Sequence, residues 1–154
     1  MYAQTKCFMF AGEMEKCNSK YCGCLYYSAN SLSRRMTKMA DEEFAITGLS
    51  SSYAFLLMTV NNKPGIQPKE ISEHMQLTPS TITRLIEKME QKKLLERKST
   101  GRSTEVYPTE KSKEMDVKIK EAWRNLYHRY SELIGEAEAK KLTADIYEAA
   151  NKLD

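Results

Sequence analysis

The stretch LTPSTITRLIEKMEQKKLLERKSTGRSTEVYPTE, residues 77–110, decides the fold that we expect for this chain. Apolar residues recur at spacings of three and four from Ile82 to Met89, which is the period of one face of an α-helix. Pro79 suits the first turn of this helix, and Thr78 before it can act as the N-cap. The opposite face then carries short hydroxyl side chains and positive charges, from Ser80, Thr81, Thr83, Arg84 and Lys88.

The helical period stops after Lys93 and gives way to two short strands. Residues 94–98 and 105–109 mix apolar and charged side chains over lengths typical of strands. The segment STGRST between them contains Gly101, which can adopt the left-handed conformation of a tight turn, and Arg102 follows it. We therefore expect a small hairpin with a basic tip directly after the helix.

Two shorter helices are expected before this helix. Pro68 opens one of them, and the connection QLT leads tightly from its end to Pro79. A more buried helix over residues 53–60 comes before it and stops at the sequence NNKPG. Two short helices joined by a tight turn and followed by a hairpin form a winged helix-turn-helix. The fold class is therefore mainly α with a small β-hairpin wing.

Long amphipathic helices are expected on both sides of this unit, over residues 22–43 and, with a break at Gly135, over residues 110–153. Their apolar stripes exceed what the short middle helices can cover. A second copy of the chain is the usual partner for such a surface, so we expect a homodimer. The alternative is that the long helices cover one another within a monomer.

A winged helix-turn-helix with this surface points to double-stranded DNA. An α-helix fits the major groove, where Ser and Thr hydroxyls reach phosphates and base edges and an Arg can make two hydrogen bonds to guanine. An Arg at a hairpin tip can enter the minor groove. We assign DNA contacts to Ser80, Thr81, Thr83, Arg84, Lys88 and Arg102. The alternative is that these side chains form an ordinary solvated face.

The composition is that of a globular intracellular protein. The chain has 154 residues, of which 41% are apolar and 29% charged, and a net charge of +3. It shows no apolar run long enough for a membrane span and no signal peptide, so we expect a cytoplasmic protein without membrane contact. Phosphate-binding glycine loops, metalloprotease helix motifs and nucleophile elbows are missing from the sequence, so we expect neither an enzyme nor a cofactor.

From about Cys22 to its end, the chain resembles the MarR family of bacterial transcriptional regulators. The resemblance rests on GIQPKEISEHMQLTPSTITRLIEKMEQKKLLERK, a short wing, and VYPTEKSKE. It implies that residues 79–92 form the recognition helix, that residues 94–109 form the wing, and that the flanking helices form an intertwined dimer. The chain departs from the family pattern at Thr100, Pro108 and Ser112, where the family usually has Asp, Leu and Gly.

All four cysteines lie in the first 24 residues, which suggests an arm over residues 1–21 ahead of a winged-helix domain over residues 22–154, with its helix-turn-helix at 68–92. Their spacing does not match paired zinc ligands, so we expect no metal site. Structural disulfides are disfavoured inside the cell. Cys22 and Cys24 are redox candidates, because a thiolate is favoured near a helix start; ordinary thiols are the alternative.

The resemblance also implies an effector cleft between the dimer helices and the DNA-binding lobe. Tyr26, Tyr53 and Trp123 could line it, although aromatic residues at helical spacing also serve as plain core. We expect a homodimeric, sequence-specific repressor of a pseudo-palindromic operator, relieved by a small ligand or an oxidant. A winged-helix module for protein association only, and a thiol-based redox sensor or peroxidase-like protein, are the alternatives.

Overall fold

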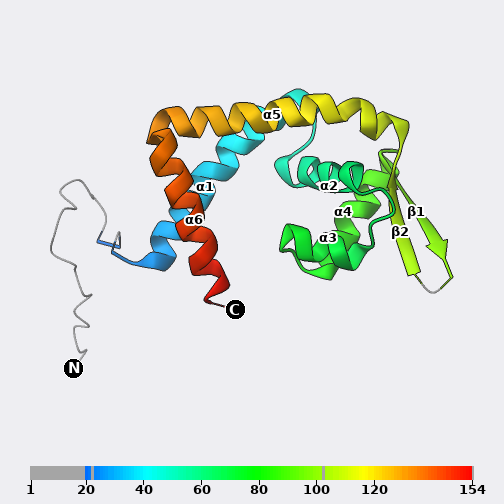
Figure 1. The fold of residues 1–154 in the computed structure, drawn as a ribbon, viewed down its shortest axis with the longest axis horizontal. Coiled ribbons are helices and arrows are strands. Elements are labelled where there is room, and N and C mark those ends of the chain that lie inside the picture. Colours follow the sequence, from blue (N-terminus) through cyan, green and yellow to red (C-terminus); the bar gives the residue numbers. More distant parts are fainter. Residues whose placement is uncertain (1–19, 22, 102, 154) are drawn as a thin grey trace. The chain divides into compact units, whose positions relative to one another are not determined.

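The computed structural model describes residues 20–21, 23–101 and 103–153, and its fold is shown in Figure 1. The elements in chain order are α1 (Leu25–Phe44), the 3₁₀ helix η1 (Ala45–Thr47), α2 (Ser51–Asn62), α3 (Pro68–Met75), α4 (Pro79–Gln91), β1 (Leu95–Thr100), β2 (Ser103–Pro108), α5 (Glu110–Ile134) and α6 (Glu136–Asn151). The order of α3, α4, β1 and β2 is that of a winged helix-turn-helix. The predicted fold class is confirmed.

The structure divides into two compact units between Met39 and Ala40, within α1. The second unit contains the end of α1 and every later element. It therefore holds the whole winged helix-turn-helix, together with the long helix α5 that follows the wing and α6 after it (Figure 1).

The core of the second unit is formed where α2 and α3 pack on the inner face of α4. The side chains of Ile82, Ile86 and Met89 in α4 are at most 1% exposed, as the helical period of the sequence predicts. Fully buried residues of the neighbouring helices are Leu56, Leu57 and Val60 of α2 and Ile71 of α3. Burial of each such side chain stabilises the fold by about 1.5–3 kcal/mol.

The turn between α3 and α4 is closed by backbone and side-chain hydrogen bonds. Gln76 adopts the left-handed conformation, with φ of 51°. This conformation lets the N–H of Leu77 bond the carbonyl of Ser72 at 3.1 Å, while the Ser72 hydroxyl donates to the carbonyl of Leu77 at 2.5 Å. The pattern is the Schellman end of a helix, which usually has Gly at the left-handed position. The turn thus fixes α4 relative to α3.

The hairpin is longer than the sequence suggested. Its register runs from Leu95 opposite Pro108 to Thr100 opposite Ser103. The strands therefore reach two residues further toward the tip than the predicted strands at 94–98 and 105–109. The pairs nearest the tip carry small polar side chains and are held by backbone pairing, which a hydrophobic pattern does not reveal.

The base of the hairpin is tied into the helical core on its other side. The N–H of Val106 donates to the carbonyl of Ile66 at 3.0 Å, and the N–H of Gly65 donates to the carbonyl of Val106 at 2.9 Å. Val106 and Ile66 are both buried. The segment before α3 thus acts as a short third strand beside β2.

A buried polar junction joins the end of α2 to the start of α5. The hydroxyl of Ser112, which is fully buried, donates to Oδ1 of Asn61 at 3.0 Å. The amide of Asn61 donates in turn to the carbonyl of Ser112 and to Oδ1 of Asp116, both at 3.3 Å. The departure from the usual Gly at this position is therefore matched by a hydrogen-bond partner on α2.

The apolar stripes of the last two helices are covered only in part. Ile119, Ala122 and Leu126 of α5 are buried. Further along α5, Leu133 is 72% exposed. Between 37% and 80% of the side chain is exposed at Leu142, Ile146 and Tyr147 of α6 and at Leu153 just beyond its end. Large exposed apolar side chains that gather on one helix are typical of a surface that a partner covers.

No single helix of the described residues is long and apolar enough to cross a membrane. Only α1 with η1, taken together with α2, has the length and composition of a span, and this pair is bent by 62°. The described part of the chain contains no group of three His, Cys, Asp or Glu side chains that could hold a metal ion. Cys24 is a free, half-buried thiol.

Candidate nucleic-acid interface

The outer face of α4 carries the predicted DNA-binding residues. Thr78 is the N-cap, and Pro79 occupies the first helical turn, as the sequence predicts. The buried inner face fixes the rotation of the helix about its axis, so the residues between the apolar positions must face solvent. All five predicted contact residues of this helix are exposed, namely Ser80, Thr81, Thr83, Arg84 and Lys88.

Hydroxyl groups gather at the start of α4. Oγ1 of Thr78 lies 2.9 Å from Oγ1 of Thr81 and 3.2 Å from Oγ of Ser80, so the three hydroxyls share hydrogen bonds. The hydroxyl of Thr83 donates to the carbonyl of Pro79 at 2.9 Å. Each oxygen keeps a lone pair and each hydroxyl can rotate, so the group can accept or donate to phosphates and base edges. The N–H groups of the first helical turn lie beside them.

The positive charges of α4 are available to a ligand. Among the described residues, no carboxylate lies within ion-pair distance of Arg84 or Lys88. They are spaced by four residues, so both lie on one side of the helix. An anionic polymer such as DNA therefore meets two unpaired cations beside the hydroxyl cluster.

The described cations of the wing are already paired within the protein. Nη2 of Arg97 lies 2.6 Å from Oε2 of Glu90, and Nζ of Lys98 lies 3.2 Å from Oε1 of Glu96. The ammonium of Lys98 also lies 4.7 Å from the ring centroid of Tyr107 on β2. Neither pair was predicted. The Glu90–Arg97 pair depends on how β1 folds back beside α4, and the Glu96–Lys98 pair joins two residues on the same face of β1. Arg102, the predicted minor-groove residue, lies outside the described residues.

Tyr107 connects the wing to the segment before α3. Its hydroxyl donates to Oε2 of Glu105 at 2.7 Å, and this hydrogen bond to a carboxylate raises the pKa of the Tyr107 phenol. The ring also lies against Gly65, where an added Cβ would come within 3.1 Å of the hydroxyl oxygen. Gly65 has φ of 83° as well, so both its backbone and its contact with the ring favour glycine.

The first turn of α3 is held by an ion pair at its start. Nζ of Lys63 lies 2.5 Å from Oε1 of Glu70, and Oε2 of the same carboxylate accepts the N–H of Gln67 at 3.1 Å. These contacts, the hydrogen bond from Lys63 first, lower the pKa of Glu70. They favour the ionised carboxylate, so this contribution to stability is present at neutral pH and is lost as the pH falls through the lowered pKa.

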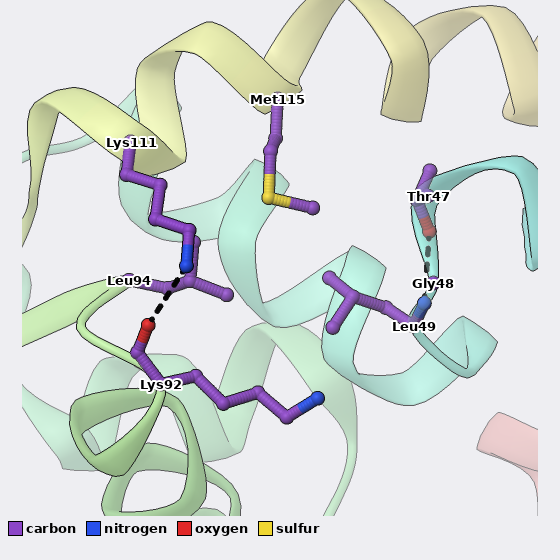
Figure 2. A pocket seen from close by; sticks show the side chains of 7 residues that line it. All are labelled: Thr47, Gly48, Leu49, Lys92, Leu94, Lys111 and Met115. Carbon is purple, nitrogen blue, oxygen red and sulfur yellow. Dashed lines mark hydrogen bonds between the residues drawn. The ribbon is translucent and has the colours of Figure 1, made fainter.

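A pocket of about 260 Å³ lies where the end of α4 meets the start of α5 (Figure 2). It is lined by Thr47, Gly48, Leu49, Lys92, Leu94, Lys111 and Met115. The side chain of Lys111 reaches from α5 to the carbonyl of Lys92, to which its ammonium donates at 3.3 Å. The pocket therefore marks the joint between the end of α4 and the long helix α5, and neither Tyr53 nor Trp123 lines it.

The predictions of effector and redox residues remain predictions. Tyr53 of α2 is half-buried, and Trp123 of α5 is 50% exposed, which differs from a plain core position. Tyr26, 78% exposed, and Cys24 belong to the first unit. Cys22 lies outside the described residues.

Comparison with known proteins agrees with this geometry. The chain matches the MarR family over residues 49–100, which extend from the start of α2 to the end of β1. It is 27% identical to the HTH-type transcriptional repressor MdtR of Bacillus subtilis (strain 168) in an alignment of 109 residues that covers 67% of this chain and 70% of that protein.

Solved structures share the fold over most of the chain. The transcriptional repressor CouR bound to a 23-mer DNA duplex superposes with a TM-score of 0.78 and 18% identity, over 88% of this chain and 99% of that one. The S. aureus MepR–DNA complex superposes with a TM-score of 0.74 and 17% identity, over 84% of this chain and 98% of that one. The family match covers the helix-turn-helix and the first strand of the wing, so residues 49–100 are similar to a MarR-family domain, and the solved structures share the fold of most of the chain.

Proposed function

We propose that this protein is a sequence-specific DNA-binding transcriptional regulator that acts as a homodimeric repressor of a pseudo-palindromic operator. It works in the cytoplasm, where its DNA lies, and has no enzymatic activity. The names of MdtR and CouR, both repressors, support repression as the direction of regulation.

One observation carries the proposal. The outer face of α4 combines an organised hydroxyl cluster at the helix start with two cations, Arg84 and Lys88, that no described acid neutralises. A solvated helix face usually alternates charges of both signs that pair along the helix, as Glu136 and Lys140 do on α6 at 2.7 Å. The recognition helix instead keeps its cations unpaired, beside hydroxyls of a size that suits the major groove.

The exposed apolar side chains of α6 support the homodimer. We expect its two-fold axis to set the two recognition helices on one face of the DNA, about one helical turn or roughly 34 Å apart. Such spacing matches a pseudo-palindromic operator. A substitution of Leu142 by Asp would place a charge in the interface and should abolish both the dimer and operator binding.

Relief of repression requires a signal that changes the spacing of the two recognition helices. A small ligand bound near Tyr26, Tyr53 or Trp123 could do so, and so could oxidation of Cys22 or Cys24. Mild peroxide should then lower operator affinity in the wild type and leave a Cys22→Ser, Cys24→Ser double variant unaffected.

Selection of bound sequences from random double-stranded DNA tests the proposal. We expect a palindromic consensus, and a dimer by light scattering in solution. An enriched pool without a consensus, bound equally by any sequence, would contradict operator recognition. No DNA binding at low salt, combined with capture of a protein partner, would favour the protein-association alternative.

A further inference from the structure

We propose that Glu90 is a positioning residue for DNA recognition: it holds the wing at a fixed angle to the recognition helix α4. The inference rests on the proposed function, since it concerns how helix and wing meet one DNA duplex together. Glu90 lies in the last turn of α4, and both of its carboxylate oxygens are bound to a single residue of β1, Arg97.

The two contacts hold both the backbone and the side chain of Arg97. Oε1 of Glu90 accepts the backbone N–H of Arg97 at 3.1 Å, and Oε2 lies 2.6 Å from its Nη2. A carboxylate bound at both oxygens has little freedom to rotate, so the contact fixes direction as well as distance. The side chain of Glu90 is 26% exposed and that of Arg97 36%, so water screens this pair only in part.

The backbone N–H of Arg97 has no acceptor in the hairpin. Arg97 lies opposite Val106, whose N–H and carbonyl are directed to Ile66 and Gly65 on the other side. The two opposite residues therefore form a non-hydrogen-bonded pair, and the N–H of Arg97 points to the outer edge of β1. Glu90 satisfies this edge group, which pairing with β2 cannot do.

The position of Glu90 makes this contact an attachment of the β1 edge of the wing to α4. The hairpin base is held by the hydroxyl of Thr109, which lies 2.9 Å from the carbonyl of Lys93 and 3.2 Å from that of Leu94. Further along, Val106 ties β2 to the segment before α3. Arg97 lies opposite Val106, so its contact with Glu90 holds the β1 edge at the same level, and the hairpin is fixed from both sides.

A carboxylate in the last turn of a helix is unfavourable by itself, because it adds negative charge to the negative end of the helix dipole. The guanidinium of Arg97 offsets that charge. The pair also neutralises the charge of Arg97. As a free cation on the wing, Arg97 would attract any phosphate backbone regardless of its sequence. The Glu90–Arg97 pair thus fixes the orientation of the wing and reduces its non-specific attraction to DNA.

The test compares Glu90→Ala with Glu96→Ala in the full-length protein. Both variants remove one negative charge from the same region, so general electrostatics predicts equal or tighter DNA binding for both. Glu96 pairs with Lys98 on its own strand and does not connect the wing to the helix. If Glu90 positions the wing, Glu90→Ala should bind the selected operator about tenfold more weakly, while Glu96→Ala should bind it at least as tightly as the wild type.

Hydroxyl-radical footprinting separates positioning from a general loss of stability. In Glu90→Ala, protection of the minor groove beside each half-site should disappear while protection around the major-groove contacts persists. A variant that merely folds less well would lose both in proportion. Thermal unfolding curves verify that both variants are folded at the temperature of the binding assay.

Amide exchange of Arg97, followed by NMR without DNA, tests the contact directly. We expect exchange at least about tenfold faster in Glu90→Ala than in the wild type or Glu96→Ala, because only Glu90 accepts this N–H. Equal exchange rates, or operator affinities of the two variants that match, would overturn the inference. A wild-type protein that selects no consensus would refute the proposed function instead, and the exchange rates would still decide whether Glu90 holds the wing.

Discussion

The helix α4 and the wing, which together form the proposed DNA-binding surface, hold their charged side chains in opposite ways. The helix is fixed by an apolar inner face and leaves Arg84 and Lys88 unpaired on its outer face. The described part of the wing has little apolar surface to bury, and its cations Arg97 and Lys98 are held by Glu90 and Glu96. The exposed charges on the wing hold the structure in place, whereas those on the helix form no ion pair with a described residue, as the proposed contact with DNA requires.

The largest effect should come from the inner face of α4. Ile86→Ala removes a side chain that is 1% exposed and should lower the free energy of unfolding by about 2–5 kcal/mol, through lost burial and the cavity left behind. Glu87→Ala, at the next position on the exposed side, is the matched control and should change it by less than about 0.5 kcal/mol. Urea unfolding of both variants measures the difference. Equal midpoints would mean that the helix is not anchored by this face.

Arg84→Ala should affect DNA binding and leave stability unchanged. The loss of operator affinity should be about 1–3 kcal/mol, with relaxed preference at one base pair if Arg84 reads a base, or a uniform loss across sequences if it contacts phosphate. Arg124→Ala removes an exposed cation from α5 and should leave both affinity and preference unchanged. Fluorescence anisotropy on the operator and on single-base variants distinguishes these cases. Unaltered affinity in Arg84→Ala would contradict the assignment of α4 as the recognition helix.

The difference between the two regions also explains what the sequence could and could not predict. The inner and outer faces of α4 were predicted residue by residue, because helical periodicity assigns each position to a face. The cap at Thr78 and the first-turn Pro79 were likewise readable, since both are local signals.

The sequence predicted the position of the wing and its hairpin structure, and it did not predict the full extent of the strands or the contact with α4. Its strands extend further toward the tip than predicted because their last pairs depend on backbone hydrogen bonds. The Glu90–Arg97 contact was missed because it spans seven residues and a change of secondary structure. Its formation depends on the left-handed conformation of Lys93, for which the sequence gives no signal because the usual Gly is missing.

The helix cap should have an intermediate effect. Thr78→Ala removes the hydroxyl that lies 3.4 Å from the N–H of Thr81 and that links the hydroxyls of Ser80 and Thr81. The free energy of unfolding should fall by about 1 kcal/mol, the usual value for an N-cap. Thr78→Ser keeps the hydroxyl and is the control. A loss in Thr78→Ser as large as that in Thr78→Ala would assign the effect to the methyl group.

The smallest effect should come from the joint between the helix and the wing, and it should be a gain in stability. Lys93 has φ of 58°, which lies in the left-handed region. In this conformation the N–H of Lys93 donates to the carbonyl of Glu90 at 2.8 Å, and the N–H of Leu94 donates to the carbonyl of Met89 at 2.9 Å. A side chain makes this conformation unfavourable by about 1–2 kcal/mol, and Gly removes that strain while it adds about 0.5–1 kcal/mol of chain entropy to the unfolded state. Lys93→Gly should therefore raise the free energy of unfolding by about 0.5–1 kcal/mol.

Lys92→Gly is the control for this substitution, because it removes the same charge one residue earlier. Lys92 has φ of −82°, an ordinary right-handed conformation, so Gly there relieves no strain and should lower stability. Changes in melting temperature of opposite sign in the two variants would show that backbone conformation, and not lysine charge, decides the effect. If both variants lose stability equally, the backbone of Lys93 carries no strain that Gly relieves. Contacts of the Lys93 side chain would then stabilise the turn that brings Arg97 within reach of Glu90. In that case Lys93→Gly should also weaken the hold on the wing, which faster exchange of the Arg97 amide would reveal.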